Sequence, residues 1–362
     1  MNTASNGYAI TAISCGRDHT LALCTDGSVI GWGGDGSGRV AAPSIEYCST
    51  AKAPTRPVEV NLEQPLAAIA AGFGVSLGIT EARDVVVWGA NAAGIGGKRK
   101  AIALAAPQAV AGVGNARVVC ADEFLFGAID RHGALVTWGL NLDGALGRVT
   151  PTINAAPGKV EIDEPLADLS VGKGYMLALT REGFAYAWGG NAAGQLGLGH
   201  LQSVSAPQPL HLEVTLRAIA AGATHTLALT ADGKVLAWGS NHHGQLGRAE
   251  YAYAARPVTV HLPEAVSHVA AGMHWSLALG ESGHVYAWGW NGHGQLGAND
   301  LVDRRTPTTI DGVRNVRALA AGETHAVALA DEGLVGWGNN ASGQIGPSDR
   351  RALRPTAFFP LG

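Results

Sequence analysis

The stretch Trp238-Gly239-Ser240-Asn241-His242-His243-Gly244-Gln245-Leu246-Gly247 decides the fold, because the chain repeats its pattern seven times. A fixed period of this size indicates that each unit is one module that cannot bury its apolar face alone, so neighbouring modules must stack. We therefore predict a single repeat domain over residues 1–362. Spacings of 56, 50, 50, 50, 50 and 49 residues separate the Trp-Gly pairs, which begin at Trp32, Trp88, Trp138, Trp188, Trp238, Trp288 and Trp337.

Each unit contains four short segments with strand character. In the fifth copy, residues 216–221 are apolar, residues 225–230 follow a tight loop, and an Asp-Gly turn leads into a strand that ends at Trp238. After the glycine-rich loop, residues 256–260 carry a leading proline, which suits a strand start or a sheet edge. No segment shows a helical period. The sequence thus predicts an all-β fold, a seven-bladed β-propeller of four-stranded antiparallel blades.

The chain ends predict how the ring closes. The N-terminal segment 8–13 is not preceded by the proline-led strand that precedes the equivalent segment in every other unit, whereas residues 354–359 form such a strand at the C-terminus. We expect this C-terminal strand to pair with the N-terminal segment and complete one blade, which would remove long exposed edges.

Composition argues against several functional classes. Only 15% of the residues are charged, the net charge is −4, and the basic residues form no run longer than three, so neither a nucleic-acid partner nor a membrane surface is expected. No signal-peptide pattern or membrane-length apolar run is present, and the four cysteines show no CxxC spacing. We expect a cytoplasmic monomer with reduced thiols and without a cofactor.

The pattern GxxHTxAL, then a turn, then WGxNxxGQLG resembles the regulator of chromosome condensation repeat family over essentially the whole chain. The resemblance implies a seven-bladed propeller. It leaves function open, because members of this family act in nucleotide exchange on the GTPase Ran, ubiquitin ligation, ultraviolet sensing and β-lactamase inhibition.

In the exchange members, acidic and His side chains of the GxxH loops make the GTPase contact. Here Asp18, Glu123 and Glu323 match in kind, whereas Asp122 replaces the usual glycine in the third unit. No extended insertion resembles the wedge that releases the nucleotide. Guanine-nucleotide exchange on a Ran-like GTPase, including exchange by a bacterial effector that imitates the eukaryotic members, is therefore the alternative function.

Antiparallel order predicts that the GxxH and WGxN loops emerge on the same face, opposite the Asp-Gly turns. Aromatic residues, His and Met at loop positions are typical of interface hot spots. Trp275 replaces the repeat histidine and could instead fill space between blades, whereas Trp290 has no aromatic counterpart in other units. The predicted partner-binding residues lie on units five and six: His242, His243, Tyr251, Tyr253, Met273, His274, Trp275, Trp290 and His293.

The histidines could also suggest a catalytic or metal site. The repeat histidines His19, His225 and His325 have counterparts that cannot bind a metal, so a structural role is expected for them. A zinc site among the histidines of units five and six lacks accompanying Cys or carboxylate spacing. We find no nucleophile beside a base and no paired carboxylates, so no catalytic residue is predicted.

We therefore predict a scaffold without catalysis that grips an unidentified protein through the face with the GxxH and WGxN loops. An enzyme or small-molecule binder that uses the central mouth is a further alternative. The extra residues of the first spacing fall around Arg39 to Arg56. That enlarged loop is consistent either with a functional role or with an insertion that costs little stability.

Overall fold

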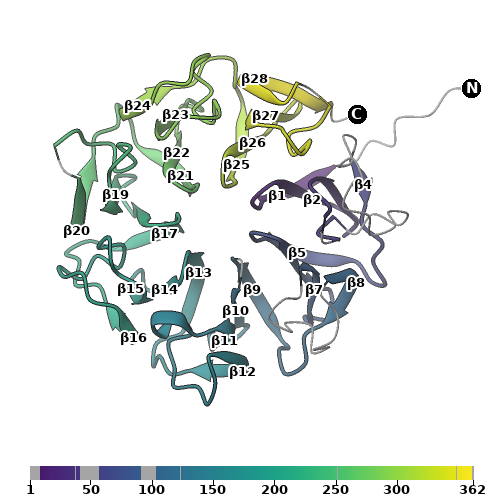
Figure 1. Ribbon diagram of the computed structural model, residues 1–362, viewed down its shortest axis with the longest axis vertical. Coiled ribbons are helices and arrows are strands. Elements are labelled where there is room, and N and C mark those ends of the chain that lie inside the picture. The colour runs from purple at the N-terminus through teal and green to yellow at the C-terminus, as the bar shows by residue number, and fades with distance from the viewer. Residues whose placement is uncertain are drawn as a thin grey trace, which may run out of the picture.

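The computed structural model describes residues 9–36, 38–40, 57–90, 103–122, 124–250, 252–347 and 349–360. Seven four-stranded antiparallel sheets stand around a central axis, as predicted (Figure 1). The one helical element in the described residues is the 3₁₀ turn η1 (Leu142–Gly144), so nothing there has the length of a membrane-spanning helix.

Every blade is built from four consecutive strands, with the first strand next to the axis and the fourth on the rim (Figure 1). Blades 1 to 3 comprise β1 (Ile10–Cys15), β2 (His19–Cys24), β3 (Val29–Gly33) and β4 (Val58–Glu59); β5 (Leu66–Ala71), β6 (Val75–Thr80), β7 (Val85–Ala90) and β8 (Ala103–Ala109); and β9 (Ala116–Ala121), β10 (Leu125–Asp130), β11 (Leu135–Leu140) and β12 (Asn154–Val160). Blades 4 and 5 comprise β13 (Leu166–Gly172), β14 (Tyr175–Thr180), β15 (Ala185–Gly189) and β16 (Val204–Pro209); and β17 (Leu216–Ala221), β18 (His225–Thr230), β19 (Val235–Ser240) and β20 (Tyr253–Val260). Blades 6 and 7 comprise β21 (Val266–Ala271), β22 (Trp275–Gly280), β23 (Val285–Gly289) and β24 (Arg304–Thr309); and β25 (Val316–Ala321), β26 (His325–Ala330), β27 (Gly333–Asn339) and β28 (Arg351–Pro360).

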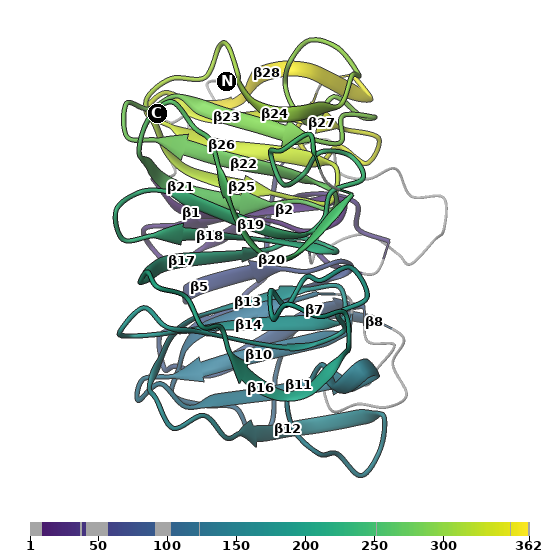
Figure 2. The ribbon, with the colours of Figure 1, turned by 90° about the vertical axis from the view of Figure 1, so that its left-hand side faces the viewer.

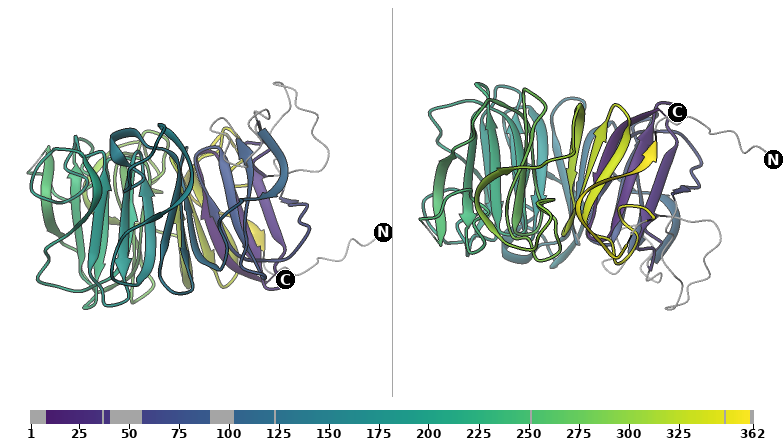
Figure 3. Two further views of the ribbon diagram at one scale, coloured as in Figure 1. Left: turned by 90° about the horizontal axis from the view of Figure 1, so that it is seen from below. Right: turned by 90° about the horizontal axis from the view of Figure 1, so that it is seen from above.

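The strands run between the two faces of a disc (Figures 2 and 3). One face, here the loop face, carries the connections from first to second and from third to fourth strands. These connections meet: the Ser240 amide donates to the Thr224 carbonyl, and the Trp290 amide to the His274 carbonyl. The opposite turn face carries the tight turns between second and third strands. The predicted division of the loops between the faces is confirmed.

This backbone favours glycine at two positions of the repeat, although Arg83 takes the turn position in the second unit with a φ of +70°. Gly233 has a φ of +81° in the turn between β18 and β19, a conformation that glycine adopts without a Cβ clash. Gly239, after the repeat tryptophan, has a φ of +100°, and a Cβ there would lie 2.5 Å from the Thr224 carbonyl. The Trp-Gly pair therefore permits the third strand to approach the loop beside it.

The hydrophobic core lies between the blades. The repeat tryptophans are fully buried, and Trp238 of blade 5 packs with Tyr175 and Leu196 of blade 4. Its indole Nε1 donates to the Gln195 carbonyl of blade 4 at 2.8 Å. In the degenerate first unit, the Arg39 carbonyl accepts from Trp88 in the same way, at 2.8 Å. Because the acceptor is a backbone carbonyl, the motif can lose its glutamine and keep this contact.

A second contact across each interface joins the first residue of one blade's second strand to the second residue of the next blade's second strand. Polar residues meet polar residues, apolar residues meet apolar ones, and the large Trp275 meets the small Ala326. The pairs are His19–Ser76, Val75–Phe126, Leu125–Met176, Tyr175–Thr226, His225–Ser276, Trp275–Ala326 and His325–Thr20.

The predicted latch between the chain ends is wrong. Within the described residues β28 pairs with β27 of its own blade, and β1 pairs only with β2. The proline-led strand closes the blade that precedes it, so the first blade lacks nothing. Ring closure instead repeats the ordinary interface: His325 Nε2 lies 3.1 Å from Thr20 Oγ1, which donates to the Gln344 carbonyl at 2.8 Å.

Replacing Thr20 by Val tests this closure. The change leaves His325 and the Gln344 carbonyl without their buried partner, and each such loss costs about 1–3 kcal/mol. We expect a comparable decrease in the free energy of unfolding, measured by urea denaturation. Thr356→Val, the same change at an exposed position of β28, serves as the control. Equal stability of the two variants would contradict closure through Thr20.

The buried histidines predict acid sensitivity. Burial lowers the pKa of His225 and of His325 to about 3, and the pKa of His19 well below its usual value. Between about pH 6.5 and 3 the unfolded chain binds protons that the folded chain does not, so stability decreases on acidification, by up to ~1.4 kcal/mol per pH unit for each histidine.

A pair exchange isolates one of these histidines. His225→Leu with Ser276→Met copies the apolar Leu125–Met176 pair of blades 3 and 4. Urea denaturation at pH 7 and pH 5 should show a smaller loss of stability than in the wild type, since one of the histidines with a lowered pKa is gone. An unchanged pH dependence in a folded variant would refute this account.

Candidate partner-binding surface

Four of the predicted residues form one ring cluster on the loop face of blades 5 and 6. The centroids of Trp290 and His293 are 5.3 Å apart with an interplanar angle of 89°. His243 lies 5.9 Å from Trp290 and stacks on His274 at 5.6 Å. We call His243, His274, Trp290 and His293 the ring cluster.

Polar side chains of the repeat motif hold the two loops of the cluster. Gln245 accepts from the His243 amide at 3.0 Å, and Gln295 accepts from the His293 amide at 2.8 Å. Asp303 bridges the blades, since its carboxylate binds His243 Nδ1 and accepts from the Asn291 amide, both at 2.9 Å. Sequence analysis did not identify Asp303, because nothing near it in the chain marks its proximity to His243.

The two tryptophans outside the Trp-Gly pairs differ in exposure. Trp290 is partly exposed, whereas the other eight of the nine tryptophans are fully buried. The prediction that Trp275 belongs to an exposed partner surface is wrong: its exposed fraction is 0%, and its Nε1 donates to the Glu323 carbonyl at 3.0 Å. The space-filling alternative for Trp275 is correct, because Ala326 leaves room for the indole.

The remaining predicted residues surround the cluster at different places. His242 is exposed in the loop beside His243. Met273 lies at the central mouth instead. Tyr253 is 49% exposed at the start of the rim strand β20. Tyr251 lies outside the described residues.

Two of the three imidazoles in the cluster have pKa values below the usual range. Burial, reinforced by His243, Lys173 and His242, lowers the pKa of His274. Burial and the nearby Arg351 lower the pKa of His293. Imidazoles around a partly exposed indole form a surface that is aromatic and polar at once, which suits a protein interface.

The described residues contain no group of three or more His, Cys, Asp or Glu side chains arranged to hold a metal ion. The geometry of the ring cluster agrees with this finding, because its rings contact one another rather than converge on a common point. The repeat histidines have the structural role that was expected, as His225 Nε2 and Ser276 Oγ of the next blade form a hydrogen bond of 3.0 Å.

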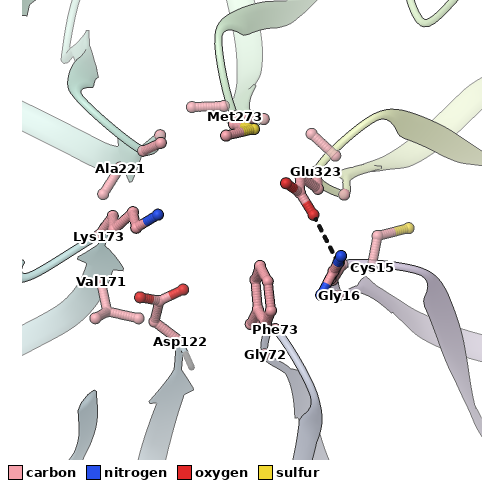
Figure 4. A pocket seen from close by; sticks show the side chains of 18 of the residues that line it. Cys15, Gly16, Gly72, Phe73, Asp122, Val171, Lys173, Ala221, Met273 and Glu323 are labelled. Carbon is pink, nitrogen blue, oxygen red and sulfur yellow. Dashed lines mark ion pairs between the residues drawn. The ribbon is translucent and has the colours of Figure 1, made fainter. Parts of the chain in front are cut away.

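The central mouth is a cavity of about 170 Å³ at the inner end of the loop face (Figure 4). Arg17 forms an ion pair with Glu323 at 3.3 Å and lies over the ring of Phe73, 4.3 Å from its centroid. The side chain of Lys173 extends toward the opening, and Asp122 adds a carboxylate (Figure 4). Positive and negative side chains therefore both lie around the mouth, so the mouth does not favour either an anionic or a cationic ligand.

The carboxylates matched to the exchange members are partly engaged. Asp18 pairs with Arg39 and Glu323 with Arg17, while Glu123 lies outside the described residues. Asp122 is accommodated because its unit has Leu125 where five of the other six units have a ring: a Cβ on Gly222 would lie 2.3 Å from His225 Cε1. Nucleotide exchange stays a prediction, and release of labelled nucleotide from Ran would test it. Residues 41–56, most of the enlarged first loop, lie outside the described residues.

Fluorescence quenching provides a check on the exposure of Trp290. Acrylamide should quench a small fraction of the native emission, because only this indole reaches solvent among nine. Trp290→Phe should remove most of that fraction, whereas Trp288→Phe should retain it, since Trp288 is fully buried. An unchanged quenchable fraction in folded Trp290→Phe would show that another tryptophan is exposed.

The sequence profile of the RCC1-like domain matches residues 96–360, and that of the regulator of chromosome condensation (RCC1) repeat matches residues 10–39. The RCC1 domain-containing protein RUG3, mitochondrial, of Arabidopsis thaliana is 35% identical over 83 residues, which are 23% of this chain and 18% of that protein. The Ultraviolet-B receptor UVR8 of the same plant is 33% identical over 92 residues, 25% of this chain and 19% of the receptor. These alignments span less than a fifth of each relative.

Solved structures show the same fold over nearly the full chain. Human WBSCR16 has a TM-score of 0.82 with 24% identity, covering 92% of this chain and 95% of its own. Prp20p of Saccharomyces cerevisiae, whose structure is described with its binding to Gsp1p and histones, has a TM-score of 0.76 with 22% identity, covering 89% and 83%. A structure of yeast RCC1 (Prp20) bound to Kap60 also has a TM-score of 0.76, with 23% identity and coverage of 99% and 86%.

Proposed function

Since the chain belongs to the RCC1-like domain family, we propose that it is a protein-binding propeller that grips a protein partner through the ring cluster on its loop face, without a catalytic step. One observation carries the proposal: among nine tryptophans, only Trp290 is not fully buried, and it lies on the loop face among three imidazoles. Tryptophan at a surface position is enriched in interface hot spots.

The arrangement of the cluster supports this role. The Gln and Asp303 hydrogen bonds hold both loops in place, so a partner would meet preformed aromatic groups and little side-chain entropy would be lost on binding. Protein binding also occurs among structural relatives, since yeast RCC1 (Prp20) is seen bound to Kap60. The identity of that partner is not transferred to this chain.

Affinity purification from native cell extract tests the proposal. Wild type is compared with Trp290→Ala/His293→Ala, and bound proteins are identified by mass spectrometry. The hot-spot residues of an interface each contribute about 2 kcal/mol or more, so the partner should be depleted at least ~30-fold from the variant.

Phe184→Ala is the matched control, because Phe184 is a 51% exposed aromatic residue on the turn face. This variant should retain the partner. Recovery of the same proteins by wild type and by the cluster variant would refute the proposed surface. So would equal depletion by Phe184→Ala.

A further inference from the structure

The rim beside the ring cluster carries exposed arginines without carboxylate partners. They lie on the outer strands of three consecutive blades, β20, β24 and β28, or directly before them (Figure 1). Within the described residues none of them has a carboxylate within ion-pair distance. We call them the arginine rim: Arg256, Arg305, Arg350, Arg351 and Arg354.

Three nearby carboxylates on this face are already engaged by other groups. Glu250 pairs with Arg248 at 3.2 Å, and Asp300 pairs with Arg304 at 2.6 Å. Asp303 is held by His243 and the Asn291 amide. These acids therefore neutralise other groups and not the arginine rim.

The arginine rim and the ring cluster form a continuous surface. The loop of blade 5 that carries His243 lies on the rim strand of blade 6, since a Cβ on Gly244 would be 2.5 Å from the Cα of Arg305. The loop of blade 6 that carries His293 lies on β28 in the same way, with Gly294 against Leu353. Arg351 is close enough to lower the pKa of His293. Arg305 and Arg351 thus flank the cluster.

The turn face of the same blades has the opposite character. Its exposed acidic side chains include Glu281, Asp311 and Glu332, as well as Asp331, which pairs with Arg317 at 3.3 Å. A partner with negative charge is therefore repelled by one face and attracted to the other, which orients its approach.

We propose that the occupant of this surface is an acidic protein segment with apolar side chains, whose carboxylates pair with Arg305 and Arg351 while its apolar groups contact Trp290. This inference rests on the proposed function and specifies the partner's chemistry. Arginine suits the role because its planar guanidinium binds a carboxylate through two hydrogen bonds. A nucleic acid is disfavoured, because Trp290 is contacted by three imidazoles, which restricts the ring faces on which a base could stack.

The test uses the full chain and a fluorescein-labelled octapeptide of six glutamates and two leucines. Fluorescence anisotropy should show binding that weakens as salt is raised from 50 to 300 mM, because rim charges are screened. A peptide with lysines in place of the glutamates should bind at least about tenfold more weakly. A ten-residue oligouridylate provides the nucleic-acid comparison.

Arg305→Glu/Arg351→Glu should weaken glutamate-peptide binding at least about tenfold, since it replaces attraction by repulsion. Arg83→Glu/Arg314→Glu makes the same change in net charge at exposed arginines of the turn face and should have little effect. Arg305→Gln/Arg351→Gln, without the reversed charge, should give an intermediate loss. Thermal denaturation checks that all variants fold.

Three results would overturn the inference: equal binding of the glutamate and lysine peptides, equal losses in the rim and turn-face variants, or binding of the oligouridylate but not of the glutamate peptide. These failures differ from failure of the proposed function. If a cellular partner requires Trp290 for binding but does not compete with the glutamate peptide, the proposed binding surface stands. Only the inference that the partner is acidic is then refuted.

Discussion

The fold depends on the packing of each repeat tryptophan between two blades, which in five of the seven units includes a hydrogen bond from the indole to a backbone carbonyl of the preceding blade. Trp238 reaches the Gln195 carbonyl, and Trp288 reaches the Gln245 carbonyl, both at 2.8 Å. The bond fixes the indole against its neighbour and satisfies a polar group inside an otherwise apolar interface. Neighbouring blades are thereby held in one relative position, and seven such packed interfaces close the ring.

This interface also explains which residues can vary. The contact between the second strands of neighbouring blades needs two side chains that match in polarity and size, not one particular residue type. The polar pair His225 and Ser276 and the apolar pair Leu125 and Met176 both meet this need. The chain closes by the same rule, through His325 and Thr20, and needs no exchanged strand. Because the acceptor carbonyls belong to the backbone, the contact between blades does not depend on which side chains the loop carries. Loop side chains can therefore vary and form a binding surface.

The loop face carries both components of the proposed surface on one side of this rigid ring. The ring cluster supplies aromatic area around Trp290, and the arginine rim supplies charge along adjacent outer strands. Repeat architecture makes the combination possible, since residues about fifty positions apart in the chain become neighbours. No loop has to move for Arg305 to lie beside His243.

The sequence by itself determined the number of blades, the four antiparallel strands of each and the face on which both loop types emerge, because period, turn glycines and strand alternation are local properties. It also predicted that His243, His274, Trp290 and His293 share one face. Only the tertiary structure decided that Trp275 is buried, since this depends on Ala326 in the next blade. Only the tertiary structure showed that β28 belongs to the same blade as β25, β26 and β27. The sequence could not show this, because a repeating pattern does not indicate at which strand each blade begins. The arginine rim likewise required the structure, because its charges are dispersed in sequence and share one sector of the rim only when three consecutive blades are placed around the axis.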